Sequence, residues 1–289
     1  MAFETQQTAG RQLPGVGEPA RGSGRDKMIM RRVAEHIRQQ HWTKVFIELV
    51  IVVLGVFIGM QVSNWNESRA EARLGRDYVK RLIRDLEEDR SSIGAEAAYY
   101  TAVLESVRKA EALLRAADPD PRALVVNAYR ATEVSFIAPV RATWDQIVSS
   151  GHLGLLPAGA VESGVSQYYA FDTAQDTYAA ALDSDYRRTV RKIIPLTLQV
   201  AMRAGCSDVR DKWGNVVGFE KDCRLDVDPV ELEAAAAALR RDPAVIADLQ
   251  YQYSMAASAV LNLKGAQATI ADALTALGSA PEPVETTSP

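Results

Sequence analysis

Cysteine and histidine are scarce in this chain of 289 residues, which contains two cysteines and three histidines. These side chains supply most zinc ligands and many catalytic nucleophiles and bases, so little material remains for a metal centre or a covalent catalyst. The sequence also lacks a Gly-x-Gly-x-x-Gly fingerprint, a Walker loop, a His-Glu-x-x-His motif and a nucleophile elbow. We therefore expect a protein that is not an enzyme and that has no cofactor and no metal.

Net positive charge is missing as well, since the formal net charge is −4. No nucleic-acid partner is expected on that balance. The charge is nevertheless uneven, because residues 1–44 contain eight Lys or Arg and four acidic residues, which leaves −8 for the rest. Hydrophobic residues make up 47% of the chain, enough for a packed core.

One long apolar run interrupts this pattern at residues 45–62, with the sequence VFIELVIVVLGVFIGMQV and Glu48 as its single charge. At 1.5 Å per residue, 18 helical residues cover about 27 Å, just enough to cross the core of a bilayer. Trp42 and Trp65 bracket the run as membrane-interface anchors would. The alternative is a core helix of a soluble protein, but no other segment is similarly apolar. We expect an uncleaved transmembrane helix.

Two signals bear on the orientation of this helix. Six basic residues lie in positions 25–44 and five in positions 64–83, a small excess that favours a cytoplasmic N-terminus. Cys206 and Cys223 flank a turn-rich stretch, and they would form a disulfide outside the cytoplasm but remain free thiols inside it. Together these signals predict a single-pass protein of the bacterial inner membrane with a periplasmic C-terminal domain.

The rest of the chain is dominated by helical periodicity, so the predicted fold class is all-α: a single N-terminal transmembrane helix followed by an antiparallel helical bundle with a small disulfide-closed hairpin insertion. The hairpin is expected within 206–228, around Trp213-Gly214-Asn215. The expected helices cover about 67–117, continuous with the span, then 120–133, Pro139 to Gly151, 158–204 with a kink at Pro195, 229–241 and 243–277.

These elements define five segments along the chain. They are a disordered tail (1–27), a basic amphipathic juxtamembrane segment (28–44), the transmembrane helix (45–62), an extracytoplasmic helical domain (63–278) and a second disordered tail (279–289). The ordered pattern begins near Met28 and Met30, either of which fits as the initiator.

The end of the span has a recognisable signature, Gln61-Val62-Ser63-Asn64-Trp65-Asn66-Glu67-Ser68-Arg69. It resembles the Gln-Val-x-Asn-Trp-Asn-Glu-x-Arg signature of a group of uncharacterised single-span bacterial membrane proteins, in which an α-helical domain of unknown function follows the span. The segment from Met28 to His36 is similar to the usual start of those proteins, and Thr143 to Leu153 is similar to their Ser-Gly helix end. The resemblance implies a location and not a mechanism.

Small residues recur on one face of the span. Glu48, Val52, Gly55, Gly59 and Ser63 follow spacings of four, three, four and four, which keep them on one stripe of a helix. Glycines four apart let two helices approach closely, so this stripe is a candidate transmembrane interface for a homodimer or for a membrane-protein partner. The alternative is a face covered only by the lipid bilayer, with Glu48 extending to the membrane surface.

Two function classes remain after these exclusions. The first is a membrane-anchored structural or interaction protein of the bacterial envelope, acting as an accessory or scaffold subunit. The alternative is an extracytoplasmic helical bundle that senses a ligand and signals through a partner protein, since few residues precede the span. Tyrosines that recur on the predicted helices fit either core packing or a ligand pocket; they are Tyr99, Tyr100, Tyr168, Tyr169, Tyr178, Tyr186, Tyr251 and Tyr253.

Overall fold

The computed structural model describes residues 42–278, of which 77% are helical and 3% lie in strands. The helical class expected from the sequence is therefore present. The tails expected at 1–27 and 279–289, together with residues 28–41 of the juxtamembrane segment, lie outside the described residues.

The first helix within the described residues, α2, runs from Trp42 to Arg115 without interruption. It contains the expected span and the expected helix that follows it. Of the helices described, it is the one that is long and apolar enough to cross a membrane, and none of its most apolar window is buried inside the structure. The contacts within the chain divide it between Glu67 and Ser68 into two units.

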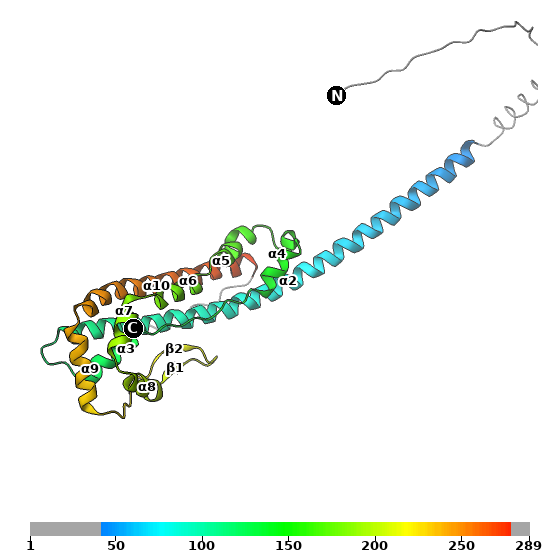
Figure 1. The fold of residues 1–289 in the computed structure, drawn as a ribbon. Helices are drawn as coiled ribbons and strands as arrows, with labels where there is room; N and C mark the ends of the chain where they lie inside the picture. The colour runs from blue at the N-terminus through cyan, green and yellow to red at the C-terminus, as the bar shows by residue number, and fades with distance from the viewer. Residues whose placement is uncertain (1–41, 279–289) are drawn as a thin grey trace, which may run out of the picture. The chain divides into compact units, whose positions relative to one another are not determined.

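The second unit contains the rest of α2, several shorter helices, a two-stranded sheet and a second long helix (Figure 1). In chain order these elements are α3 (Pro121–Arg130), α4 (Ala142–Ser149), the 3-10 helix η1 (His152–Leu155), the π-helical turn η2 (Val161–Val165), α5 (Ser166–Ala170), α6 (Thr173–Leu182), α7 (Asp185–Ile193), α8 (Leu196–Gly205), β1 (Asp208–Arg210), β2 (Val216–Phe219), α9 (Pro229–Arg241) and α10 (Pro243–Ala276).

Three of these helices begin in the same way, with an aspartate followed by a proline. Asp120, Asp228 and Asp242 each accept a hydrogen bond from the backbone N–H two residues later, and a proline is the first helical residue. The aspartate satisfies an N–H group that the helix itself cannot pair, and proline has the backbone angle of a helix start. The sequence therefore fixes where α3, α9 and α10 begin.

The prediction of a single helix over 158–204 is wrong, because the structure has several shorter helices there. Gly164, with a φ of 113°, interrupts the helical backbone inside η2. Asp172 and Ser184 have non-helical backbone angles, and their side chains cap the N-termini of α6 and α7. Pro195 separates α7 from α8 instead of kinking one helix, because Ile194 before it is extended.

The helix expected to start at Pro139 begins three residues later, at Ala142. The N–H of Val140 donates to Oδ1 of Asp89 over 2.8 Å. This bond ties the extended segment before α4 to α2.

Most of the core of the second unit lies in two clusters of buried apolar side chains. The first joins Tyr78, Leu82 and Leu86 of α2 to Ile270 and Leu274 of α10, together with side chains of α4 and α5. In Figure 1, α10 runs alongside α2, and α6 lies next to α10.

The second cluster lies at the other end of the unit. It joins the last turns of α2 to α3, α7, α8, α9 and the start of α10, with Leu124, Leu198 and Leu239 fully buried at its centre. A smaller group connects the hairpin to α2 and α10 through Tyr99, Val103 and Phe219.

The hairpin insertion is present between α8 and α9. Strands β1 and β2 are antiparallel, with Asp208 opposite Phe219. The carboxylate of Asp211 accepts from the backbone N–H groups of Trp213 and Asn215, which closes the turn. Cys206 and Cys223, which flank the strands, are joined by a disulfide with the two Cα atoms 4.4 Å apart.

Candidate functional site

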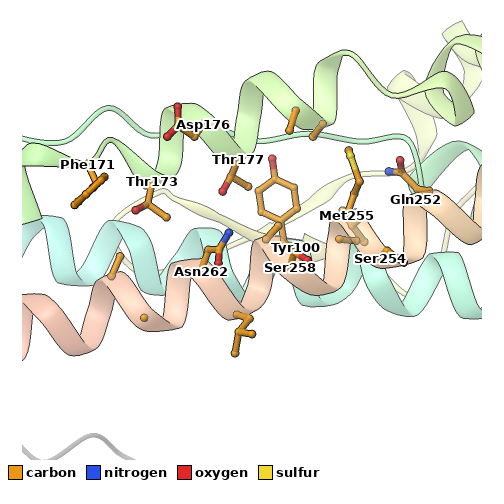
Figure 2. Close-up of a pocket in the computed structure, with 18 of the residues that line it drawn as sticks. Tyr100, Phe171, Thr173, Asp176, Thr177, Gln252, Ser254, Met255, Ser258 and Asn262 are labelled. Atoms are coloured by element: carbon orange, nitrogen blue, oxygen red, sulfur yellow. The ribbon is translucent and has the colours of Figure 1, made fainter.

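A cavity of about 610 Å³ lies between α6 and α10 in the second unit. Figure 2 shows α6 and α10 on opposite sides of it, with the ring of Tyr100 from α2 between them. A volume of this size is within the range of cavities that bind small molecules. Another cavity, beside the hairpin, has a volume of about 550 Å³ and a more polar lining.

The cavity exists because small side chains line both helices. α10 contributes Ala256, Ala259, Gly265 and Ala266, and α6 contributes Ala180 and Ala181. A Cβ atom built on Gly265 would meet no other atom within 4 Å. The space beside this glycine is therefore open to a larger group.

Polar side chains reach the cavity at intervals along both helices. Thr173, Asp176 and Thr177 come from α6, and Ser258 and Asn262 come from α10 (Figure 2). Among the described residues that line the cavity, Asp176 has the only charged side chain. The lining is thus mostly apolar, with a few hydroxyl and amide groups and one carboxylate.

Aromatic rings form a further part of this lining. Tyr100 and Tyr168 are buried, whereas Phe171 and Tyr251 are largely exposed at the cavity. The hydroxyl of Tyr100 donates to the carbonyl oxygen of Ser135 over 3.1 Å, so this side chain presents its ring to the cavity and its polar end to a loop. Some of the tyrosines thus pack in the core and some also line a cavity, and whether that cavity is a ligand pocket stays a prediction.

Asp89 is a buried carboxyl group on α2 close to the cavity. Together with Tyr168 and Arg141 it lines a separate small cavity of about 10 Å³, a volume of about one water molecule. Burial raises the pKa of Asp89 to about 6, although the hydrogen bond from the N–H of Val140 acts in the opposite direction.

Glu96 lies two turns further along α2 and is completely buried. Neither of its carboxylate oxygens has a hydrogen-bond partner of normal geometry. Burial raises the pKa of Glu96 to about 8, and the backbone N–H of Ile137 offsets only part of this effect. The nearby charge of Asp172, at the start of α6, raises the pKa further. Glu96 is therefore protonated at neutral pH.

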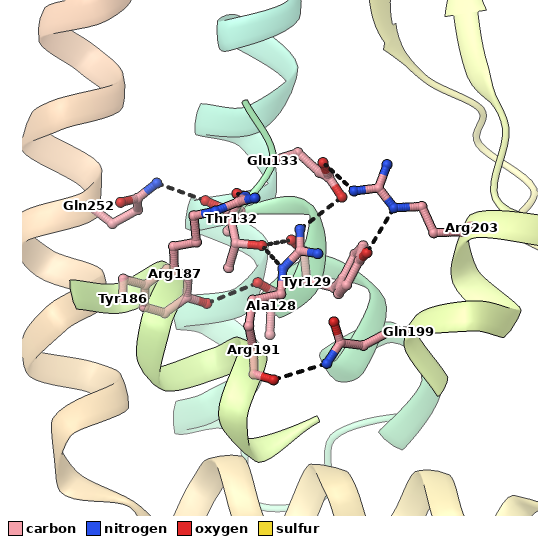
Figure 3. Close-up of polar contacts among 11 residues, drawn as sticks. Ala128, Tyr129, Thr132, Glu133, Tyr186, Arg187, Arg191, Gln199, Arg203 and Gln252 are labelled. Atoms are coloured by element: carbon pink, nitrogen blue, oxygen red, sulfur yellow. Dashed lines mark hydrogen bonds and ion pairs between the residues drawn. The ribbon is translucent and has the colours of Figure 1, made fainter. Parts of the chain in front are cut away.

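A network of polar contacts joins α7 and α8 to the loop after α3 (Figure 3). Glu133 pairs with Arg191 over 2.9 Å and with Arg203 over 3.6 Å. Arg187 donates to the carbonyl oxygen of Thr132, and Arg191 Nε donates to the hydroxyl of Thr132 over 2.7 Å. Each of the three arginines thus has a partner within the chain, and the network holds these elements together.

The same loop also connects to the cavity through Gln252 of α10. Its Nε2 donates to the carbonyl oxygen of Ala131 over 2.8 Å, and its Oε1 accepts from the hydroxyl of Ser184 over 2.6 Å. Both side chains are buried. Gln252 also lines the cavity, so it links one wall of the site to the start of α7.

His152, which follows α4, contacts two hydroxyl groups. Tyr78 and Ser150 both lie 2.9 Å from its Nδ1 atom. The hydroxyl of Ser150 is also within 2.7 Å of the carbonyl oxygen of Gln146, a contact typical of a helix end. The contact with Tyr78 is not predictable from the sequence, because 74 residues separate the two side chains.

The residues expected at the transmembrane interface all lie on the first part of α2. Glu48, Val52, Gly55, Gly59 and Ser63 are exposed there, and a Cβ at either glycine would meet no atom within 4 Å. Trp42 and Trp65, the expected interface anchors, are also exposed. The role of this face stays a prediction.

Comparisons with known proteins place no further constraint on the site. No family model, no curated protein and no solved structure matches the chain. Within residues 42–278, no group of three or more His, Cys, Asp or Glu side chains is arranged to hold a metal ion.

Proposed function

We propose that this chain is a membrane-anchored, non-enzymatic interaction protein of the bacterial envelope, with a single span at 45–62, a cytoplasmic N-terminus and a periplasmic antiparallel helical bundle. One observation supports the proposal most: every residue of 45–62 is exposed, whereas the second unit buries its own apolar side chains. A continuous apolar surface of this length needs a covering, and lipid supplies one. The disulfide fits an oxidising compartment.

The anchor serves an interaction role if one face of the span meets protein. The stripe of Glu48, Val52, Gly55, Gly59 and Ser63 is proposed as that face, because the two glycines offer no side chain to hold a neighbouring helix away. A partner on this face would also remove the carboxyl group of Glu48 from hydrocarbon.

A photo-crosslinking experiment in native membranes tests this function. A photo-reactive residue at Val52, on the stripe, should give a crosslink to a second copy of the chain or to one membrane protein, and the chain should resist extraction by alkaline carbonate. The same group at Val53, off the stripe, is the matched control and should react with lipid. Release of the chain by carbonate would contradict the anchor, and equal products from both positions would contradict the interface.

A second candidate function is ligand sensing through a separate partner protein. The cavity of about 610 Å³ between α6 and α10 favours it, because an interaction role alone does not require an open space of ligand size inside the domain.

A further inference from the structure

The cavity between α6 and α10 differs from an anion site in the groups that line it. Of its described lining residues, none is lysine, arginine or histidine. A bound anion would therefore leave water without a compensating charge, which costs much of its binding free energy. This excludes phosphates and carboxylates as the preferred class of ligand.

The one charge in the lining is the carboxylate of Asp176. Its side chain is exposed, and it has no hydrogen bond or ion pair with the part of the chain that the structure describes. Asp176 lies in the first turn of α6, where the helix carries a partial positive charge of about half a unit. Asp172 already caps that end of the helix, with its carboxylate accepting from the N–H of Gln175 over 3.0 Å. Asp176 therefore adds a full negative charge to the N-terminus of α6, where Asp172 already compensates the partial positive charge of the helix.

Aromatic rings in the lining complement this charge. The ring of Tyr100 lies between the two helices (Figure 2), and the exposed side chains of Phe171 and Tyr251 also line the cavity. Aromatic faces attract cations that have lost part of their water. Alanines on both helices accept an apolar body, and Asn262 and Ser258 offer neutral hydrogen-bond partners.

We infer that this cavity binds a small organic cation with an apolar body, whose charged group lies at Asp176 and against the aromatic rings. The inference rests on the second candidate function, ligand sensing, and names the chemical class of its ligand. The anchor and its transmembrane interface do not depend on it.

Three probes with one apolar body and different charges test the inference. They are 4-tert-butylbenzylamine, which is a cation at pH 7, the neutral 4-tert-butylbenzyl alcohol and the anion 4-tert-butylbenzoate. Binding to the full chain in phosphatidylcholine nanodiscs is measured by titration calorimetry, with empty nanodiscs as the reference. The cation should bind at least about tenfold more tightly than the alcohol, a difference of about 1.4 kcal/mol, and the anion should bind most weakly.

Two variants and one control connect the binding to the cavity. Asp176→Asn should abolish the preference for the cation and leave binding of the alcohol unchanged. Glu233→Gln removes the same charge from an exposed position on α9 and should change nothing. Gly265→Leu fills the open space beside α10 and should weaken all three probes, while the thermal midpoint shows that the domain remains folded.

The outcomes separate the two proposals. If the alcohol or the anion binds as tightly as the cation, and Gly265→Leu still weakens it, the cavity is a ligand site but the inferred class is wrong. If none of the probes binds, or if binding ignores Gly265→Leu, both the cation site and the sensing function are contradicted.

Discussion

The backbone N–H of Arg224 donates to the carbonyl oxygen of Gly205 over 3.0 Å. These two residues lie immediately outside the Cys206–Cys223 disulfide, so a hydrogen bond and a covalent bond together close the base of the hairpin insertion. The approach is close enough that a Cβ at Gly205 would lie 1.9 Å from the carbonyl oxygen of Arg224. Only glycine fits here without a shift of the backbone.

Replacing Gly205 by alanine should therefore destabilise the domain, because the new methyl group meets backbone and not the end of a flexible side chain. Overpacking of this kind costs about 1–3 kcal/mol. Gly265→Ala is the matched control, since a Cβ there meets no atom within 4 Å and alanine favours a helix by about 0.5–1 kcal/mol. The measurement is urea unfolding monitored by circular dichroism. The urea concentration at the midpoint should be lower for Gly205→Ala than for the parent, and higher for Gly265→Ala.

The starts of the helices were the most predictable part of the fold where aspartate and proline stand together. Pro243 marked the start of α10, because a proline at the first helical position is a local signal that needs no tertiary contact. The breaks between 158 and 204 are not predictable from the sequence, for the opposite reason. Ser184 and Asp172 are capping residues, but the apolar spacing continues across them and resembles one helix.

The candidate site was less predictable than the fold. The sequence indicated that tyrosines such as Tyr100 and Tyr168 could line a pocket, but it could not show which helices would meet. Asp176 looks like an ordinary exposed residue until α10 is placed opposite α6. The burial of Glu96 depends on α2 being covered, and its position on an otherwise apolar face was the only signal available.

The disulfide should contribute measurably to stability. Substituting both Cys206 and Cys223 by serine opens a loop with a sequence separation of 17 residues, and the chain-entropy relation gives a loss of about 3 kcal/mol for a loop near this length. The measurement is urea unfolding of both proteins without reductant. Protein isolated with its thiols blocked should take up alkylating reagent only after reduction. Labelling before reduction would mean that the pair is not oxidised in the cell.

Glu96 should make the stability of the domain depend on pH. Between about 4.5 and 8 the native state keeps the proton that the unfolded chain releases, so the free energy of unfolding falls as pH rises through this range. Glu96→Gln keeps the shape of the protonated side chain and carries no charge. Its thermal midpoint should exceed that of the parent above pH 8, and its pH dependence should be flatter.

Glu105→Gln is a suitable control for that measurement, because Glu105 is an exposed carboxylate on the same helix. It should leave the pH dependence of the parent unchanged. A parent whose thermal midpoint rises between pH 5 and pH 8 by an amount that Glu96→Gln does not alter would show that Glu96 is ionised in the folded domain.

The glycines of the span should control association between helices. Replacing Gly55 and Gly59 by isoleucine places branched side chains where two backbones would meet and should abolish self-association or docking in a membrane two-hybrid assay. Replacing Val53 and Val56 by isoleucine, off the stripe, should preserve it. Equal signals from both double variants, or none from the parent, would assign the stripe to lipid.

The placement of the helical domain outside the cytoplasm is tested most directly by a reporter fused after Gly278. A phosphatase that is active only outside the cytoplasm should be active in this fusion when the full chain precedes it. A deletion of residues 45–62 should abolish that activity, because without the span the phosphatase would stay in the cytoplasm. Activity of a strictly cytoplasmic reporter at the same position, with an inactive phosphatase, would contradict a periplasmic domain.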